Sequence, residues 1–327
     1  MTVSHANDTE NAEAAQVIET FSSGYQLTEI ARTPDGTVRW TRRPGLNRTD
    51  RYPPPHPDFR RRAASVSDTD FAFHTPTHST ADHAAWSVPG ARTLAAHMLA
   101  GTREPQLLHT DLLAAGRGLA RLHRLPVEPS LAGVYPEPRW PRRFLDWLRS
   151  GQAPRAGAAW HFKLRRHLGP RRWQTLLDMT DRMLHQQRTP VVLHGWPSTG
   201  SLVLADDPTA FPRIAVLSGL EVALGAAEVD LACLLGELVE FRYYAQNAGN
   251  AVHVAGVDAA VTALLDGYGP AVDRSAVATG AVVRVATHAH DFAAYVGWHT
   301  ALDTYAAIIT ELLDDPDRTV PTDPTRP

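Results

Sequence analysis

Cysteine, lysine and long hydrophobic runs are nearly absent from this sequence of 327 residues. The only cysteine, Cys233, lies in an apolar helical stretch, so no disulfide framework is possible and a buried, unreactive thiol is expected. No run approaches the roughly 18 apolar residues that span a membrane, and the polar N-terminus lacks the pattern of a secretion signal. These absences predict a cytoplasmic protein without a membrane partner.

The charge of the chain is almost balanced. The formal net charge is −3, which gives no general attraction to nucleic acid, and only one of the 32 basic residues, Lys163, is a lysine. No group of histidines and carboxylates has the spacing of a metal site. His288 and His290, for example, are two residues apart and therefore fall on different faces of a helix.

The first third of the chain is patterned for strands and the remainder for helices. Residues 25–31 and 37–42 alternate apolar and polar side chains around Pro34-Asp35-Gly36, which predicts a hairpin. Beyond residue 91 leucines recur at helical spacing. We therefore expect an α+β protein with a small β-rich lobe and a large helical lobe. The expected boundaries are a flexible tail at 1–20, the small lobe at 21–90, the helical lobe at 91–313 and a second flexible tail at 314–327.

The most informative segment runs from residue 191 to residue 235. An apolar strand ends in His194-Gly195, a loop closes at Gly200, two more apolar strands follow, and a helix then carries Asp230. This order resembles the aminoglycoside phosphotransferase family. There the pattern is His-Gly-Asp, an Asn, a strand that ends in a metal-binding Asp, and a helix that begins near Phe-Asp-Leu-Ala.

Two upstream segments extend the resemblance. The run Leu119-Ala-Arg-Leu-His-Arg-Leu-Pro126 is similar to a helix of the family that ends in Leu-His-x-Leu-Pro. Residues 86–90, Trp-Ser-Val-Pro-Gly, resemble the hinge between the lobes, where the adenine base would dock. The resemblance implies a bilobal kinase-like fold with Trp86 and Val88 as nucleotide contacts.

The catalytic residues of the family are replaced in this chain. Trp196 stands where the catalytic Asp is expected, Ser201 where the Asn is expected, and Ser218 where the metal-binding Asp is expected. Phosphoryl transfer relies on magnesium to hold phosphate oxygens, magnesium prefers carboxylate ligands, and an indole cannot accept a proton. By this pattern, ATP and magnesium could act only in an atypical mode, and Trp196 is expected to pack against neighbouring side chains instead.

Other residues of the degenerate site have structural interpretations. His194 is expected to hydrogen-bond backbone across the loop, and Ser198 to form the loop itself, since no lysine completes a phosphate-binding loop there. Glu221 is the carboxylate closest to the lost metal position, and a solvated acid is favoured for it.

Lysine is missing from the small lobe, where active kinases of this fold use one on the third strand. Arg39, Arg42 or Arg43 could substitute, although a guanidinium is not an equivalent point charge. The predicted hairpin also has few glycines, since only Gly24 and Gly36 are available, which argues for poor cover of a phosphate group.

Basic residues are concentrated in residues 139–172, which hold ten of them against the single acid Asp146. Solvated helix faces and an anion-binding surface are both compatible with this pattern. If the stretch binds an acidic partner, the candidate contacts are Arg142, Arg143, Arg165 and Arg166.

Three functions are compatible with these residues, and we predict the first, a phosphotransferase-like subunit that handles or phosphorylates Ser and Thr of a precursor peptide. Degenerate members of the family resemble the phosphotransferase-like subunits that act with a separate lyase on Ser and Thr of ribosomal precursor peptides, as in class V lanthipeptide and thioamitide maturation. That resemblance implies a precursor peptide with an acidic leader and a lyase or other maturation proteins as partners. The alternatives are a catalytically inactive pseudokinase scaffold or peptide-binding protein, and an ordinary small-molecule kinase, which the lost ligands make the least favoured.

Overall fold

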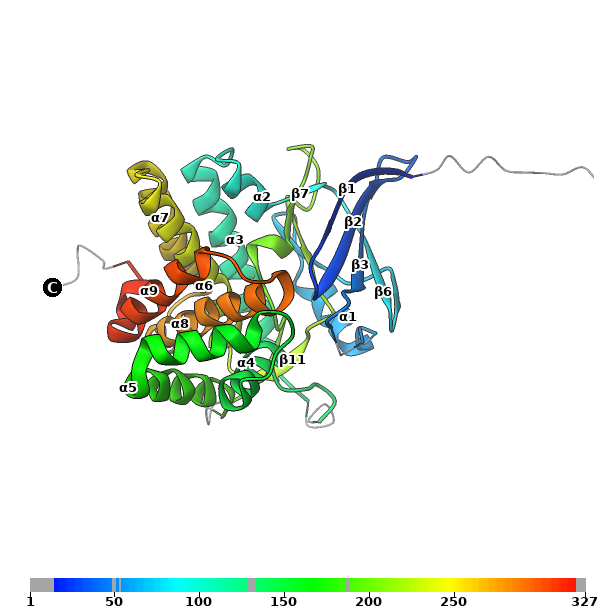
Figure 1. Ribbon diagram of the computed structural model, residues 1–327. Helices are drawn as coiled ribbons and strands as arrows, with labels where there is room; N and C mark the ends of the chain where they lie inside the picture. The colour runs from blue at the N-terminus through cyan, green and yellow to red at the C-terminus, as the bar shows by residue number, and fades with distance from the viewer. Residues whose placement is uncertain (1–14, 49–50, 53, 129–132, 186–188, 322–327) are drawn as a thin grey trace, which may run out of the picture.

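The two predicted lobes are present in the computed structural model (Figure 1), which describes residues 15–48, 51–52, 54–128, 133–185 and 189–321. The small lobe is built on an antiparallel sheet with strand order β1-β2-β3-β6-β5. Its strands are β1 Gln16–Ser22, β2 Gln26–Arg32, β3 Val38–Pro44, β5 His78–Thr80 and β6 His83–Val88, and helix α1 spans Pro57–Val66.

Short strands join the lobes. A second sheet has the order β4-β10-β9-β7, so β4 of the small lobe pairs in parallel with β10, which lies far along the chain. These strands are β4 Phe71–His74, β7 Arg92–Thr93, β9 Leu202–Leu204 and β10 Ile214–Leu217; β8 Val191–Leu193 pairs separately with β11 Ala223–Gly225.

The helical lobe follows from apolar stripes on its helices. In α3, Leu108, Leu112, Leu119 and Leu122 are all buried, as their spacing predicts. The α-helices are α2 Leu94–Leu99, α3 Pro105–Arg124, α4 Arg139–Ser150, α5 Gly157–His185, α6 Glu228–Asn247, α7 Ala251–Tyr268, α8 Arg274–Asp291 and α9 Ala301–Asp314. Short helical turns are η2 Thr199–Ser201, the π-helical η3 Phe292–Val296 and η4 Pro316–Thr319.

Both predicted tails are shorter than the sequence suggested, as far as the described residues show. Residues 16–20, assigned to the first tail, form most of β1, because they pair with β2. In the second tail, Thr319 is fully buried and donates a hydrogen bond to the Pro316 carbonyl at 2.8 Å. The remaining tail residues, 1–14 and 322–327, lie outside the described part of the chain.

The part of the chain that the structure describes contains no helix that is both long and apolar enough to cross a membrane.

A buried cluster fills the junction between the lobes. The inner face of the small-lobe sheet contributes Ile30, Trp40 and Trp86, and the second sheet contributes Val203 and Leu217. Trp40 and Trp86 are directly paired across β3 and β6. The lobes are therefore held together by apolar packing at the place where the resemblance puts a nucleotide cleft.

Candidate functional site

The loop after β8 is fixed by one buried carboxylate. Asp230, near the start of α6, is fully buried and accepts hydrogen bonds from the backbone N–H groups of His194 at 2.7 Å and Gly195 at 2.9 Å. A third hydrogen bond joins Asp230 to Nε2 of His123 at 3.1 Å. Gly195 has φ +90°, and a Cβ there would lie 1.6 Å from the Glu221 carbonyl oxygen, so only glycine fits.

His194 has the architectural role that the sequence suggested. Its Nε2–H donates to the Leu217 carbonyl at 3.2 Å, and its Nδ1 accepts the Trp196 N–H at 3.3 Å. This pair of contacts requires the neutral ring. Burial lowers the pKa of His194, which also favours the neutral form.

Trp196 is packed, as expected, against side chains of the helical lobe. The guanidinium groups of Arg284 and Arg143 lie over its ring, at 4.9 Å and 5.5 Å from the ring centroid, and Trp140 meets it edge-on at 5.9 Å. Such stacked cations are attracted to the indole face. The position that would hold a catalytic acid is therefore part of an aromatic and cationic wall.

The serines of the degenerate site bond to the protein's own backbone. The Ser201 hydroxyl donates to the Ser198 carbonyl at 2.7 Å and accepts the Ser198 N–H at 3.0 Å. The Ser218 hydroxyl donates to the His74 carbonyl at 2.9 Å, and Ser218 is almost completely buried. These hydrogen bonds support a structural role for Ser198 in the loop. None of the three serines offers a charged group to a metal ion.

Glu221 is not a free metal ligand. Its carboxylate forms an ion pair with Arg48 at 3.0 Å, and Arg139 lies 3.9 Å away. Among the described residues, no group of three histidine, cysteine or acidic side chains could hold a metal ion. The solvated acid expected from the sequence is thus corrected to a partly buried, paired carboxylate.

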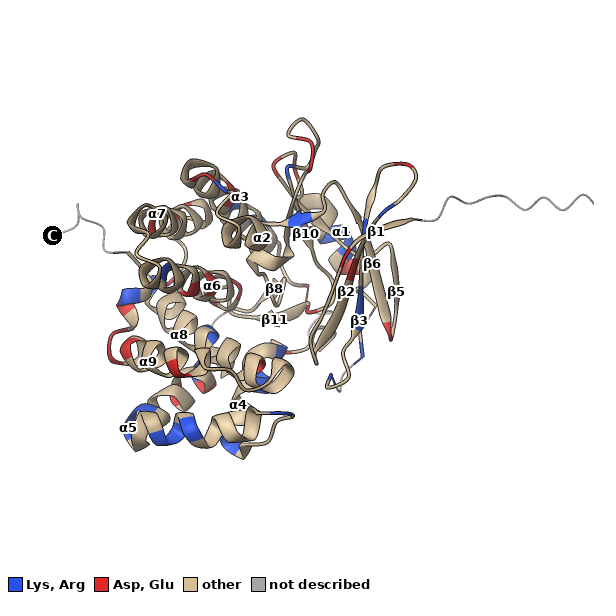
Figure 2. Cartoon of the chain, turned by 45° about the horizontal axis from the view of Figure 1, so that its top comes forward, with Lys and Arg blue, Asp and Glu red and all other residues tan. Residues whose placement is uncertain are grey.

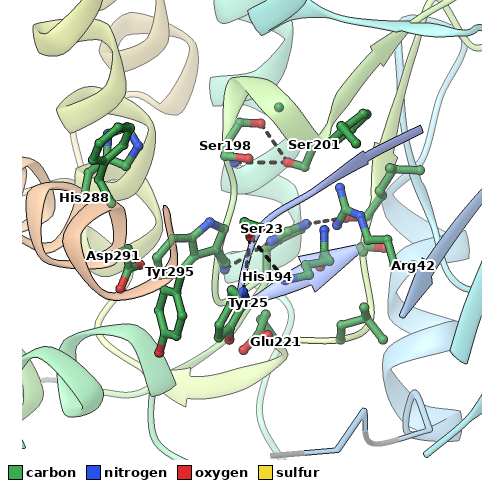
Figure 3. A pocket seen from close by; sticks show the side chains of 18 of the residues that line it. Ser23, Tyr25, Arg42, His194, Ser198, Ser201, Glu221, His288, Asp291 and Tyr295 are labelled. Atoms are coloured by element: carbon green, nitrogen blue, oxygen red, sulfur yellow. Dashed lines mark hydrogen bonds between the residues drawn. The ribbon is translucent and has the colours of Figure 1, made fainter. Parts of the chain in front are cut away.

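A cavity of about 390 Å³ lies beside this loop (Figure 3). Its walls come from the small lobe, the loop after β8, β10 and the segment after it, the end of α8 and η3. The lining residues are Phe21, Ser23, Tyr25, Gln26, Arg42, His194, Trp196, Ser198, Gly200, Ser201, Leu217, Ser218, Gly219, Leu220, Glu221, His288, Asp291, Phe292, Tyr295 and Val296.

Arg42 is the candidate arginine of the small lobe that reaches this cavity. Strand alternation places Arg42 on the inner face of β3 and Arg39 on the outer, exposed face. The Arg42 guanidinium lies over the Trp86 ring at 5.4 Å, and its enclosed Nε finds no hydrogen-bond partner in the described structure. Burial lowers the pKa of Arg42, and no described carboxylate forms an ion pair with it.

The proposed hinge contacts occupy the interior. Trp86 is fully buried and donates its indole N–H to the Ser218 carbonyl at 3.1 Å, and Val88 is 2% exposed. Trp40 donates its indole N–H to the Gly90 carbonyl in the hinge-like segment at 3.0 Å. The side chains of Trp86 and Val88 fill the junction between the lobes and are not among the residues that line the cavity, and their assignment as nucleotide contacts stays a prediction.

The four arginines proposed for substrate binding do not form one surface. Arg143 turns inward and pairs with Asp291 at 2.8 Å, whereas Arg142 pairs with Glu137 at 2.7 Å. Burial opposes ionisation of Asp291, but Arg143 and His290 outweigh it and hold the Asp291 pKa below its usual value. Arg165 and Arg166 are exposed on α5, among the basic residues of that helix (Figure 2).

Sequence reasoning missed one group at the cavity. His288 of α8 lines it and is bonded through Nδ1 to Glu240 of α6, while the Tyr305 hydroxyl of α9 donates to Glu240 at 3.2 Å. The three residues lie on different helices, so no local spacing could have indicated the group.

No protein-family model matches the sequence, and the search of curated proteins finds no match either. Solved structures do match. Spectinomycin phosphotransferase APH(9)-Ia, solved with ADP and spectinomycin, has a TM-score of 0.57 at 13% identity over 93% of each chain. Amicoumacin kinase hAmiN, solved with AMP-PNP, Ca²⁺ and Ami, has a TM-score of 0.56 at 13% identity over 94% of this chain and 90% of that one. A glucosamine kinase has a TM-score of 0.53 at 15% identity over 89% and 79%. These matches confirm the kinase-like aminoglycoside phosphotransferase fold.

Proposed function

We propose that this protein is a catalytically inactive, kinase-fold binding subunit that holds an acidic precursor peptide for other maturation proteins, such as a lyase, without phosphorylating it. One observation carries the proposal: Trp40 and Trp86 fill the junction between the lobes where the resemblance places adenine. The site also lacks the catalytic Asp, the Asn and the metal-binding Asp of the family, since Trp196, Ser201 and Ser218 stand at these positions.

The charged side chains around the cavity favour a ligand that carries negative charge. Arg48 and Arg143 are paired with Glu221 and Asp291, respectively, so their charges are compensated within the protein. Within the described residues no carboxylate forms an ion pair with Arg42, although the charge of Glu221 acts on it, and a partly enclosed cation without an ion pair favours an anionic ligand. Aromatic walls from Tyr25, Trp196 and Tyr295 suit an apolar neighbour of that anion. The resemblance to peptide-maturation subunits supplies the peptide class.

The isolated chain is expected not to bind ATP with magnesium. The reason is the combination of a filled junction and missing carboxylate ligands. Isothermal titration calorimetry with ATP and magnesium should give no binding heat up to millimolar nucleotide. Tight magnesium-dependent binding by the purified chain would overturn the inactive assignment.

Arg42→Gln is expected to weaken binding of an acidic peptide by at least about tenfold, because a charge-assisted hydrogen bond contributes about 1.5–3 kcal/mol. The probe is a fluorescein-labelled short peptide of alternating phenylalanine and glutamate, and fluorescence anisotropy gives its affinity. The matched control is Arg39→Gln, which removes a charge from the outer face of the same strand. Equal affinity of the two variants for the peptide would show that Arg42 does not contact it.

A further inference from the structure

A second polar group faces the cavity from the helical lobe. The Nδ1 edge of His288 is engaged by a carboxylate oxygen of Glu240. The Tyr305 hydroxyl bonds to the same Glu240 oxygen and lies 3.2 Å from His288 Nδ1. Contacts from two neighbouring helices therefore fix the orientation of the imidazole.

The other nitrogen of His288 remains available. The His288 side chain is 41% exposed and lines the cavity (Figure 3). Its Nε2 has no hydrogen-bond partner in the part of the chain that the structure describes. With Nδ1 occupied, Nε2 is the polar atom that the ring can offer to a bound molecule.

The charges around His288 favour its protonated form. Glu237 and Glu240 bring two negative charges from α6, and Arg284 of α8 pairs with Glu237 at 3.1 Å. One negative charge is left over, which a proton on His288 balances. Burial lowers the pKa of His288, but Glu240 outweighs burial and raises it above the ordinary value.

Two other ionisable groups near His288 do not change this balance. Asp291, on the same helix, is already paired with Arg143. Tyr305, from α9, stays neutral because burial and Glu240 raise its pKa further above the ordinary value.

We propose that His288 is an ionisable ligand contact, which donates its Nε2–H to a carboxylate of the bound molecule and is oriented for this by Glu240 and Tyr305. The proposal rests on the proposed function, since it names a second anion contact in the same cavity. Together with Arg42, it gives the cavity two cationic contacts, a pattern that suits peptides with more than one carboxylate.

The sign of the pH dependence follows from the raised pKa. The Nε2–H donor is present below the folded-state pKa of His288 and is lost as pH rises through it. Affinity for a carboxylate ligand should therefore be high at mildly acidic pH and fall by about tenfold or more as the histidine loses its proton.

The experiment has two measurements on the full chain. Anisotropy with the phenylalanine–glutamate peptide is recorded across pH 5.5 to 9 for wild type, His288→Gln, Glu240→Gln and the exposed control His109→Gln. In parallel, the ¹³C-labelled His288 resonance, identified by its loss in His288→Gln, is titrated with and without sodium benzoate.

The proposal expects a pH-dependent affinity in wild type and His109→Gln, a flat profile in His288→Gln, and a lower midpoint in Glu240→Gln. It also expects benzoate to move the His288 titration to higher pH. A pH dependence that survives in His288→Gln, or a His288 titration that benzoate leaves unchanged, overturns it. If benzoate moves the His288 titration to higher pH but the peptide does not bind, the carboxylate contact of His288 is supported and the proposed peptide-binding function is wrong.

Discussion

Replacing Asp230 with alanine should lower the free energy of unfolding by about 3–5 kcal/mol. The Asp230 carboxylate is fully buried and accepts the backbone N–H groups of His194 and Gly195 as well as a hydrogen bond from His123. Removal leaves these donors enclosed without acceptors, and each unsatisfied donor costs about 1–3 kcal/mol. Urea denaturation followed by tryptophan fluorescence measures the change.

Two variants separate this effect from a general loss of charge. Asp230→Asn keeps an oxygen acceptor and should cost less than Asp230→Ala. Asp82→Ala removes an exposed acid and should change stability by no more than about 0.5 kcal/mol. A loss of less than about 1 kcal/mol in Asp230→Ala would show that the loop after β8 holds its shape without this carboxylate.

Replacing Trp86 with alanine should also cost about 3–5 kcal/mol, because a large, fully buried side chain leaves a cavity between the lobes. The change also removes the indole donor to the Ser218 carbonyl. ATP turnover should nevertheless remain absent, because Trp196, Ser201 and Ser218 still provide no carboxylate for magnesium. Denaturation and a coupled ATPase assay test the two halves of this prediction.

The control for size is Trp298→Ala, since Trp298 is 51% exposed and should lose less than about 1 kcal/mol. Magnesium-dependent ATP hydrolysis by Trp86→Ala would contradict the inactive assignment. That result would mean that the filled junction between the lobes prevents ATP hydrolysis in the wild-type chain, and that the missing metal ligands do not.

The two-lobe order and the loss of catalytic groups at the loop can both be recognised in the amino-acid sequence. Apolar spacing predicted the α3 stripe, because burial of one helix face depends on neighbours three and four residues apart. The identities of Trp196, Ser201 and Ser218 show from the sequence alone that these three positions supply no carboxylate, because side-chain chemistry does not depend on the fold. Residues 16–20 escaped prediction, since a strand exposed along its length has no buried face to pattern.

Which side chains meet depends on the long-range packing of the folded chain. Alternation separates Arg39 from Arg42, but the packing of the sheet against β9 and β10 decides which of the two faces the cavity. The hinge-like segment gave no sign that Trp40 and Trp86 would fill the junction, because Val203 and Leu217 of the same cluster lie more than a hundred residues further along the chain. The same holds for His288, whose two-residue spacing from His290 argued against a shared site on one helix. Its partners, Glu240 and Tyr305, come from two other helices, and long-range packing of this kind leaves no mark in local sequence.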